Sequence, residues 1–178
     1  MNFETIASKI IHKGKVFTVR LDQVRMPDGK QAQFDIIDHP PAVTLVPVDT
    51  ENNIWFIRQY RHAIGGEILE LPAGVIEAGE PPDLCASREI REETGMSAGQ
   101  ILSIGEFYQV PGYSTEYMYV FLARDLKPDP LPGDEDEYIS VERMPVDAAY
   151  RMAQRGEILD AKTLAALLLA APHLGKGI

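Results

Sequence analysis

The sequence predicts an α/β fold in which helices flank a mixed sheet, with a small β-rich region at the N-terminus. Short apolar segments bounded by turn residues recur over residues 10–124, as expected for strands. Helix start and stop signals surround residues 82–94 and residues 146–155, and a further helix follows Asp160. The chain has 178 residues, of which 45% are hydrophobic, so it can bury a substantial core.

The N-terminal residues predict a hairpin over residues 10–37. Strand-forming residues run up to a turn signal, Met-Pro-Asp-Gly, at residues 26–29. A His-Pro-Pro run at residues 39–41 then breaks the chain. We therefore expect a β-rich region over residues 1–40 and a larger domain over residues 41–178.

The larger domain alternates predicted strands and helices. Arg61 directly follows a strand, so we expect it at the strand end, either on a surface rim or in a site. Residues 125–136 form a Pro- and Asp-rich loop that is long enough to suggest function or mobility. The predicted strands cover residues 42–48, 54–60, 101–110, 117–124 and 138–143, and a further strand begins at residue 68 and is ended by Pro72. The last helix ends near Pro172.

Six acids lie in the short stretch from Gly74 to Met96. Prolines suit the start of a helix over residues 82–94, and Gly95 suits its end. At roughly 100° per residue, one face collects Arg88 and the glutamates, while the opposite face packs. That charged face carries Glu89, Glu92 and Glu93.

Glutamates at this spacing repel one another and destabilise a helix unless a cation compensates. Arg88 can offset only part of that repulsion. Mg²⁺ is held by a few carboxylates together with waters and substrate phosphates, which this cluster could supply. A solvated acidic helix face is the alternative interpretation of three such glutamates alone.

The whole stretch resembles the signature of the Nudix hydrolases. Nine positions match, a coincidence expected by chance on the order of once in 10⁹ windows. The segments at residues 58–74 and 108–116 are similar to the ADP-ribose pyrophosphatase branch, in which a Pro stands sixteen residues after the last motif Gly, as Pro111 does here. The nine matching residues are Gly74, Glu80, Arg88, Glu89, Ile90, Glu92, Glu93, Gly95 and Met96.

This resemblance implies a β-α-β sandwich and hydrolysis of a nucleoside diphosphate linked to a sugar. It implies a homodimer in which residues 1–40 are shared, with residues 41–178 as the catalytic domain. The leading hypothesis is Mg²⁺-dependent cleavage of ADP-ribose to AMP and ribose 5-phosphate, with Mn²⁺ as a substitute ion. The alternatives are a GDP-mannose or general nucleotide-sugar hydrolase and, in another class, a nucleotide sensor that does not cleave.

The resemblance also implies roles for individual residues. Mg²⁺ would be bound by the Ala73 carbonyl and by Glu89, Glu92 and Glu93, with Glu80 in support. Arg88 would orient these glutamates, and Glu92 with Arg88 would belong to the catalytic set. Substrate contacts are expected from Arg61, Glu70, Pro111 and Glu116, and the base-stacking aromatic is Phe17 or a neighbour.

A general base must take a proton from the attacking water. In this branch it comes from a late acidic loop, which predicts Glu135 or Glu137, on the same side of an extended loop. A solvated acidic turn is the alternative for that loop. Glu116, or water activated by metal without a side-chain base, would then take its place.

Charge and cysteine usage limit the partners and the location. The net charge of −10 argues against nucleic-acid binding through a basic surface. The single Cys85 excludes an intrachain disulfide and fits a reducing compartment, where it is expected to be a small packing residue. Charged residues interrupt the N-terminal segment, and no apolar run is long enough for a bilayer. We expect a cytoplasmic protein without a membrane partner.

Overall fold

The computed structural model describes residues 2–133 and 138–177. Contacts divide the chain into two compact units. The first contains Met1–Pro41 and Phe107–Met118, and the second contains Ala42–Glu106 and Tyr119–Ile178. The break after Pro41 lies next to the expected one. The sequence pattern did not indicate that Phe107–Met118 would join the N-terminal unit.

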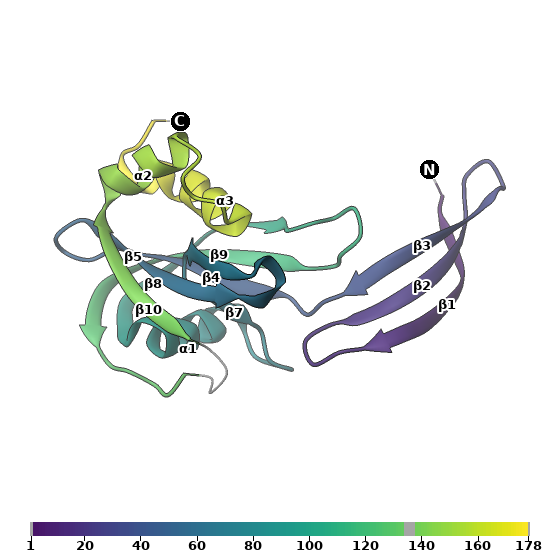
Figure 1. Ribbon diagram of the computed structural model, residues 1–178, viewed down its shortest axis with the longest axis horizontal. Helices are drawn as coiled ribbons and strands as arrows, with labels where there is room; N and C mark the ends of the chain where they lie inside the picture. The colour runs from purple at the N-terminus through teal and green to yellow at the C-terminus, as the bar shows by residue number, and fades with distance from the viewer. Residues whose placement is uncertain (1, 134–137, 178) are drawn as a thin grey trace. The chain divides into compact units, whose positions relative to one another are not determined.

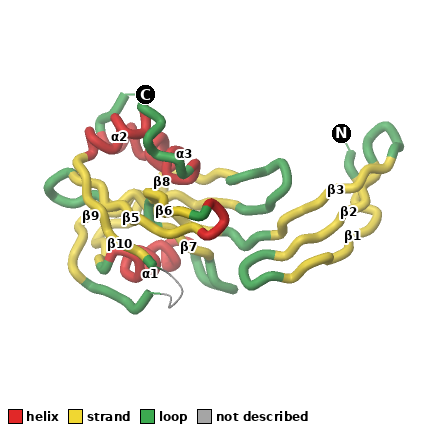
Figure 2. Tube along the Cα trace, viewed as in Figure 1, coloured by secondary structure: helices red, strands yellow, loops and turns green. Residues whose placement is uncertain are grey.

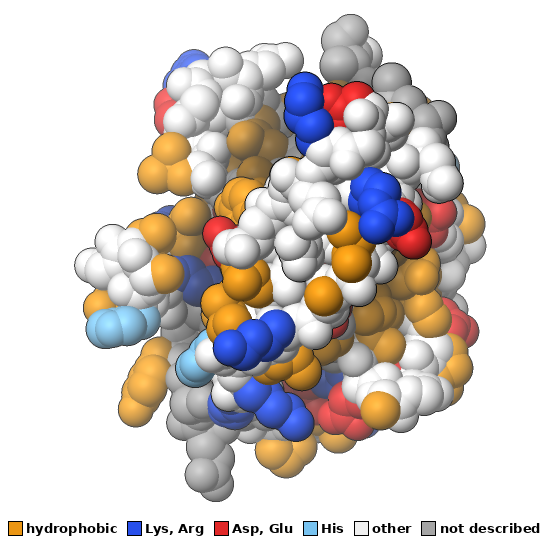
Figure 3. Space-filling view, turned by 90° about the vertical axis from the view of Figure 1, so that its right-hand side faces the viewer, with side chains coloured by type: hydrophobic (Ala, Val, Ile, Leu, Met, Phe, Trp, Pro, Cys, Tyr) orange, Lys and Arg blue, Asp and Glu red, His pale blue; other side chains and the backbone are white. Residues whose placement is uncertain are grey.

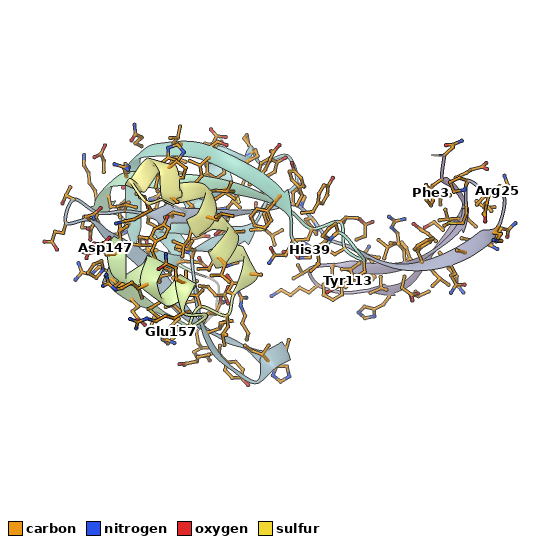
Figure 4. All side chains as sticks on the ribbon, turned by 90° about the horizontal axis from the view of Figure 1, so that it is seen from above. Phe3, Arg25, His39, Tyr113, Asp147 and Glu157 are labelled. Atoms are coloured by element: carbon orange, nitrogen blue, oxygen red, sulfur yellow. The ribbon has the colours of Figure 1, made fainter. Side chains whose placement is uncertain are left out.

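The first unit is built on an antiparallel sheet with the strand order β1-β2-β3. Strands β2 (Thr18–Arg25) and β3 (Gln31–Asp38) form the predicted hairpin. Strand β1 (Glu4–Lys13) was not predicted, because its charged residues interrupt the apolar alternation that marks a strand. It pairs with β2 from Glu4 opposite Arg25 onward, and Figure 4 shows Phe3 and Arg25 at the same end of the sheet.

The loop at residues 109–116 extends this unit. Ile37 N donates to Tyr113 O at 2.8 Å, and Thr115 N donates to Ile37 O at 3.0 Å. His39 N donates to Thr115 Oγ1 at 2.9 Å, so the chain is held again just after β3. His39 and Tyr113 lie close to one another where the chain leaves β3 (Figure 4).

The second unit is a sandwich of strands and helices, as the sequence predicts (Figures 1 and 2). Its strands form the orders β7-β4-β9-β8 and β10-β5-β6. Helix α1 (Pro82–Thr94) lies on one side of the strands, and α2 (Val146–Gln154) and α3 (Ala161–Ala170) lie on the other. The strands are β4 (Ala42–Pro47), β5 (Asn53–Arg61), β6 (Gly66–Glu70), β7 (Ala73–Val75), β8 (Met96–Tyr108), β9 (Tyr117–Pro128) and β10 (Ile139–Pro145).

The core of this unit lies between β4, β9 and α1. All six residues of β4 are buried, which explains why its sequence is apolar at every position except Thr44, whose hydroxyl donates to Pro72 O at 3.1 Å. Val43 and Leu45 of β4 pack with Ile90 of α1 and Phe121 of β9. Cys85 belongs to the same cluster, so its predicted packing role is confirmed.

Two boundaries of the predicted strands differ by more than two residues from the structure. Strand β9 continues to Pro128, into the predicted loop, although Asp125 within it has a φ of 57°. Strand β8 begins at Met96 rather than near residue 101. Gly95, with a φ of 73°, ends α1 and redirects the chain within one residue.

The termini of the second unit's helices are held by polar contacts. Asp160 caps α3 as predicted, because its carboxylate accepts from Thr163 N at 2.9 Å. Asp147 in the first turn of α2 pairs with Lys176 near the C-terminus. Within the described residues, every helix is too short or too polar to cross a membrane.

Candidate active site

Helix α1 begins and ends where the sequence predicts. Pro82 is its first residue, and Asp83 places a negative charge in the first turn, where the helix dipole favours it. At the other end, Gly95 N donates to Arg91 O in a left-handed cap. These signals position the glutamates on the third and fourth turns.

The glutamates are divided between two environments. Glu92 is partly exposed, whereas Glu89 and Glu93 are only 8% and 6% exposed. The sequence predicted that one face of the helix collects the three glutamates, and it did not predict that two of them are buried. The reason lies in the tertiary structure. Helix α1 packs against both β4 and β7, so a larger part of its surface is buried than one apolar stripe would require.

Arg88 binds three carboxylates at once. Its Nε and Nη2 donate to the two oxygens of Glu80, each at 3.0 Å. Its Nη1 donates to Glu89 Oε1 at 2.6 Å and to Glu92 Oε2 at 2.8 Å. These bonds connect the loop before α1 to the helix and offset the repulsion between the glutamates.

The pKa values in this cluster follow from the same contacts. Hydrogen bonds from Arg88 lower the pKa of Glu80 to about 2, although partial burial opposes this change. The bonds to Glu80 and the nearby Glu89 raise the pKa of Arg88 further above its usual range. Burial raises the pKa of the Cys85 thiol, which keeps this side chain neutral.

Gly74 provides the space for Glu89. A Cβ built on Gly74 would lie 1.9 Å from the Cδ and Oε1 atoms of Glu89. No side chain can occupy that position while the carboxylate stays where it is. The contact that requires a glycine here is the approach of Glu89 to the backbone.

Glu93 is bound by the backbone at the first residue of β7. Ala73 N donates to Glu93 Oε2 at 2.8 Å. This bond brings the start of β7 to the end of α1, so Ala73 and the glutamates lie in one locality. The role of the Ala73 carbonyl as a metal ligand stays a prediction.

The donor set suits a hard divalent cation. Three glutamates on one helix and a fourth on the adjoining loop supply oxygen ligands, and Gly74 leaves room for one of them against the backbone. Arg88 holds one oxygen of Glu89 and one of Glu92. Among residues 2–133 and 138–177, the carboxylates are paired with Arg88 and the backbone rather than grouped around a common point.

Arg61 lies at the end of β5, as predicted, and Glu70 lies at the end of β6 beside it. Arg61 Nε and Nη2 donate to the two oxygens of Glu70 at 2.6 and 2.7 Å. The Arg61 side chain is 43% exposed, whereas that of Glu70 is 4% exposed. Glu70 therefore lies behind Arg61, and direct contact of either residue with substrate stays a prediction.

The other expected site residues lie elsewhere in the chain. Phe17, just before β2, is 39% exposed, and Pro111 and Glu116 lie in the loop between β8 and β9. These three belong to the first unit, and their contact with substrate stays a prediction. Glu135 and Glu137, the predicted general bases, lie outside the described residues.

Two family models match the chain, side by side. Residues 38–167 match the NUDIX domain, and residues 3–37 match the nucleoside diphosphate sugar hydrolase N-terminal domain. The chain belongs to the Nudix hydrolase family. The resemblance in the stretch from Gly74 to Met96 is thus confirmed, and this Nudix hydrolase carries the N-terminal domain of the enzymes that act on nucleoside diphosphate sugars.

Comparison with curated proteins and solved structures agrees with this assignment. This Nudix hydrolase is 37% identical to an ADP-ribose pyrophosphatase of Bacillus subtilis, over 92% of this chain and 90% of that protein. It is 39% identical to an ADP-ribose pyrophosphatase of Mycobacterium tuberculosis, over 94% and 82%. A crystal structure of an ADP compounds hydrolase matches the fold with a TM-score of 0.88 at 24% identity, covering 98% of this chain and 95% of the other. The chain is a Nudix pyrophosphohydrolase similar to ADP-ribose pyrophosphatases.

Sequence reasoning missed one polar group beside the site of this Nudix hydrolase. Lys162 and Asp160, on the first turn of α3 and at its cap, reach the buried Glu70 region. Asp160 was expected only to cap α3, and no spacing rule connects residue 162 to residue 70. The signal that was available is a lysine within an otherwise apolar helix.

We predict that Gly74→Ala destabilises this Nudix hydrolase by about 1–3 kcal/mol, because its Cβ displaces the Glu89 carboxylate or the β7 backbone. Urea unfolding measures the change. Gly66→Ala is the matched control, since a Cβ there meets nothing within 4 Å. Equal stability of the two variants would show that Glu89 does not need this space.

Proposed function

We propose that this Nudix hydrolase cleaves the pyrophosphate of ADP-ribose to AMP and ribose 5-phosphate with the help of Mg²⁺. Its membership among the Nudix nucleoside diphosphate sugar hydrolases is established by the family models. The observation that carries the finer proposal is similarity along nearly the whole chain, N-terminal region included, to two ADP-ribose pyrophosphatases. A reducing, cytoplasmic location is part of the proposal and rests on the sequence alone.

The reaction places water on one phosphorus of the substrate. The bond from that phosphorus to the bridging oxygen breaks, and the bridging oxygen leaves with the other phosphate. The charged oxygens of the pyrophosphate repel an incoming nucleophile. Bound Mg²⁺ supplies neutralisation of that charge and activation of water.

The residues of α1 would hold the ion. Glu89, Glu92 and Glu93 are the ligands we assign, with Glu80 and the Ala73 carbonyl in support. Arg88 would keep these carboxylates oriented, because it already binds Glu80, Glu89 and Glu92. Its place in the catalytic set is to hold these carboxylates rather than to touch the reacting water.

Arg61 would hold the substrate. It is an exposed cation at a strand end of a chain whose net charge is −10, so it is suited to bind an oxygen of the anionic diphosphate. Proton removal is assigned to Glu135 or Glu137. Glu116, Pro111 and Phe17 are assigned to the sugar and base ends of the substrate.

The protein would act as a homodimer joined through residues 1–40. Every residue of β1 is exposed within the chain, including Ile10 and Ile11. A strand that buries so little adds little stability to its own chain. Apolar side chains, in orange, lie at the surface of the protein (Figure 3). The large exposed ones within residues 1–40 are those that a second copy would cover: Phe3, Ile6, Ile10, Ile11, Val16, Phe17 and Phe34.

We predict that ADP-ribose is the preferred member of a panel containing GDP-mannose, ADP-glucose, dinucleotide polyphosphates and nucleoside triphosphates. Product analysis by anion-exchange chromatography with Mg²⁺ should give AMP and ribose 5-phosphate with the highest kcat/KM. Preference for GDP-mannose would move the assignment to another nucleotide sugar. Binding without cleavage of every compound would favour a sensor.

We predict that substitutions in the helix glutamates and in the late acidic loop have different effects on Mg²⁺ binding and on turnover. Glu93→Gln should weaken Mg²⁺ binding, seen by calorimetry without substrate, and lower turnover. The double variant Glu135→Gln/Glu137→Gln should bind Mg²⁺ as the parent does and lose about 10²- to 10⁴-fold in kcat. If this double variant keeps the parent's rate at saturating Mg²⁺, the general base lies outside the loop.

We predict that a chain beginning at Ala42 loses both the dimer and the activity. Ile10→Asp in the full chain should shift the mass in light scattering from dimer to monomer, because it places a charge in the proposed interface. Gln33→Asp is its matched control, because this exposed polar residue of β3 lies three positions from Ile36, which is in register with Arg20 and Ile10, and so points to the other face. A truncated chain that remains an active monomer would contradict the shared N-terminal sheet.

A further inference from the structure

Lys162 is a buried lysine that none of the roles assigned above uses. The residue is 8% exposed and lies in the first turn of α3. Its Nζ donates to Glu70 Oε2 at 3.0 Å, to Asp160 Oδ2 at 3.0 Å and to Leu71 O at 3.3 Å. An ammonium has three donors, and three acceptors surround this one.

Two effects disfavour a lysine at this position. Burial removes the ammonium from water, and the N-terminal end of a helix carries partial positive charge. The carboxylates of Glu70 and Asp160 have to offset both costs. A methionine of similar volume would avoid them, so packing of α3 alone does not explain a lysine here.

Glu70 transmits the position of Lys162 to Arg61. The carboxylate is almost fully buried and is bound on one side by Lys162 and on the other by the two-pronged donation of Arg61. Burial alone would raise the pKa of Glu70, but the bonds from Arg61 and the charge of Lys162 outweigh it and hold that pKa below its usual range. An ionised Glu70 offers both oxygens to the guanidinium, which fixes its plane.

We propose that Lys162 is a positioning residue for the substrate diphosphate: it fixes Glu70, and Glu70 fixes the exposed guanidinium of Arg61 in the orientation that receives a phosphate oxygen. The proposal rests on the proposed function, because it takes Arg61 as a diphosphate ligand. It adds to that function a residue that does not touch the substrate, Lys162 in the first turn of α3, which acts on Arg61 at the end of β5.

A purely structural role for Lys162 would be to fasten α3 to the end of β6. Thr163 already does this independently of Glu70, because Leu71 N donates to Thr163 Oγ1 at 2.8 Å. Thr163→Val removes that contact at nearly constant volume, together with the bond from Thr163 Oγ1 to Asp160 Oδ2 at 2.6 Å. The bonds from Lys162 Nζ to Glu70 and to Leu71 O do not involve Thr163, so this variant is the matched control for a loss of α3 attachment without loss of the Glu70 contact.

The test is a double-mutant cycle between Lys162→Met and Arg61→Ala, with kcat and KM measured for ADP-ribose and Mg²⁺. Lys162→Met should lower kcat/KM by about 10- to 100-fold, as misplacement of a positioning group does. In the Arg61→Ala background the same change should have almost no further effect, because Lys162 acts through Arg61. Thr163→Val should lose stability in urea and keep kcat/KM near that of the parent.

A second readout does not depend on turnover. The Nε–H signal of Arg61 in a ¹⁵N NMR spectrum is identified by its loss in Arg61→Lys. The rate at which this proton exchanges with solvent should increase in Lys162→Met and stay at the parent's value in Thr163→Val. If Lys162→Met does not fold, Lys162→Gln, which keeps a donor, carries both measurements.

The outcomes separate the two proposals. Additive losses in the cycle, or an Arg61 signal that Lys162→Met leaves unchanged, would overturn the positioning role. A loss of kcat/KM in Thr163→Val equal to that in Lys162→Met would overturn it as well. Absence of ADP-ribose cleavage by the parent would instead remove the proposed substrate, while the NMR measurement would still decide whether Lys162 orders Arg61.

Discussion

The binding of three carboxylates by the single guanidinium of Arg88 is the interaction on which the acidic centre of this protein depends. Glutamates one turn apart on a helix repel one another, and two of them are buried here, where repulsion is screened least. Arg88 joins Glu89 and Glu92 on α1 to Glu80 on the preceding loop. It therefore holds the loop, the helix and the carboxylates in one arrangement.

Two ion clusters lie on either side of the short connection from β6 to β7. In one cluster, Arg88 forms ion pairs with Glu80 and with Glu89 of α1. In the other, Glu70 is paired with both Arg61 and Lys162, and Lys162 is also paired with Asp160. The first cluster has more carboxylates than cations, which suits metal binding. The second has equal numbers of each and exposes a cation. Both a bound metal ion and an exposed cationic side chain can neutralise the negative charge of a diphosphate.

Close backbone contacts make this arrangement specific. Gly74 admits Glu89, Ala73 N binds Glu93, and Thr163 binds Leu71 N, so a few main-chain groups around the β6–β7 connection are committed to side chains from distant helices. Backbone donors that are paired in this way do not need water, and the site can be packed closely. The N-terminal sheet is the opposite case, because its strands pair well but bury little within one chain.

The sequence by itself determined the class of fold, the bounds of α1 and the family, because these depend on local signals: capping residues, apolar periodicity and a motif of nine positions. It did not reveal strand β1, whose pairing with β2 comes from contacts between residues rather than from an apolar alternation of its own. Burial of Glu89 and Glu93, the space left by Gly74 and the contact of Lys162 with Glu70 were decided only by the tertiary structure. Each of these depends on which segment, separated in the chain, packs against a given face, and the periodicity of a single helix or strand contains no information about its neighbour.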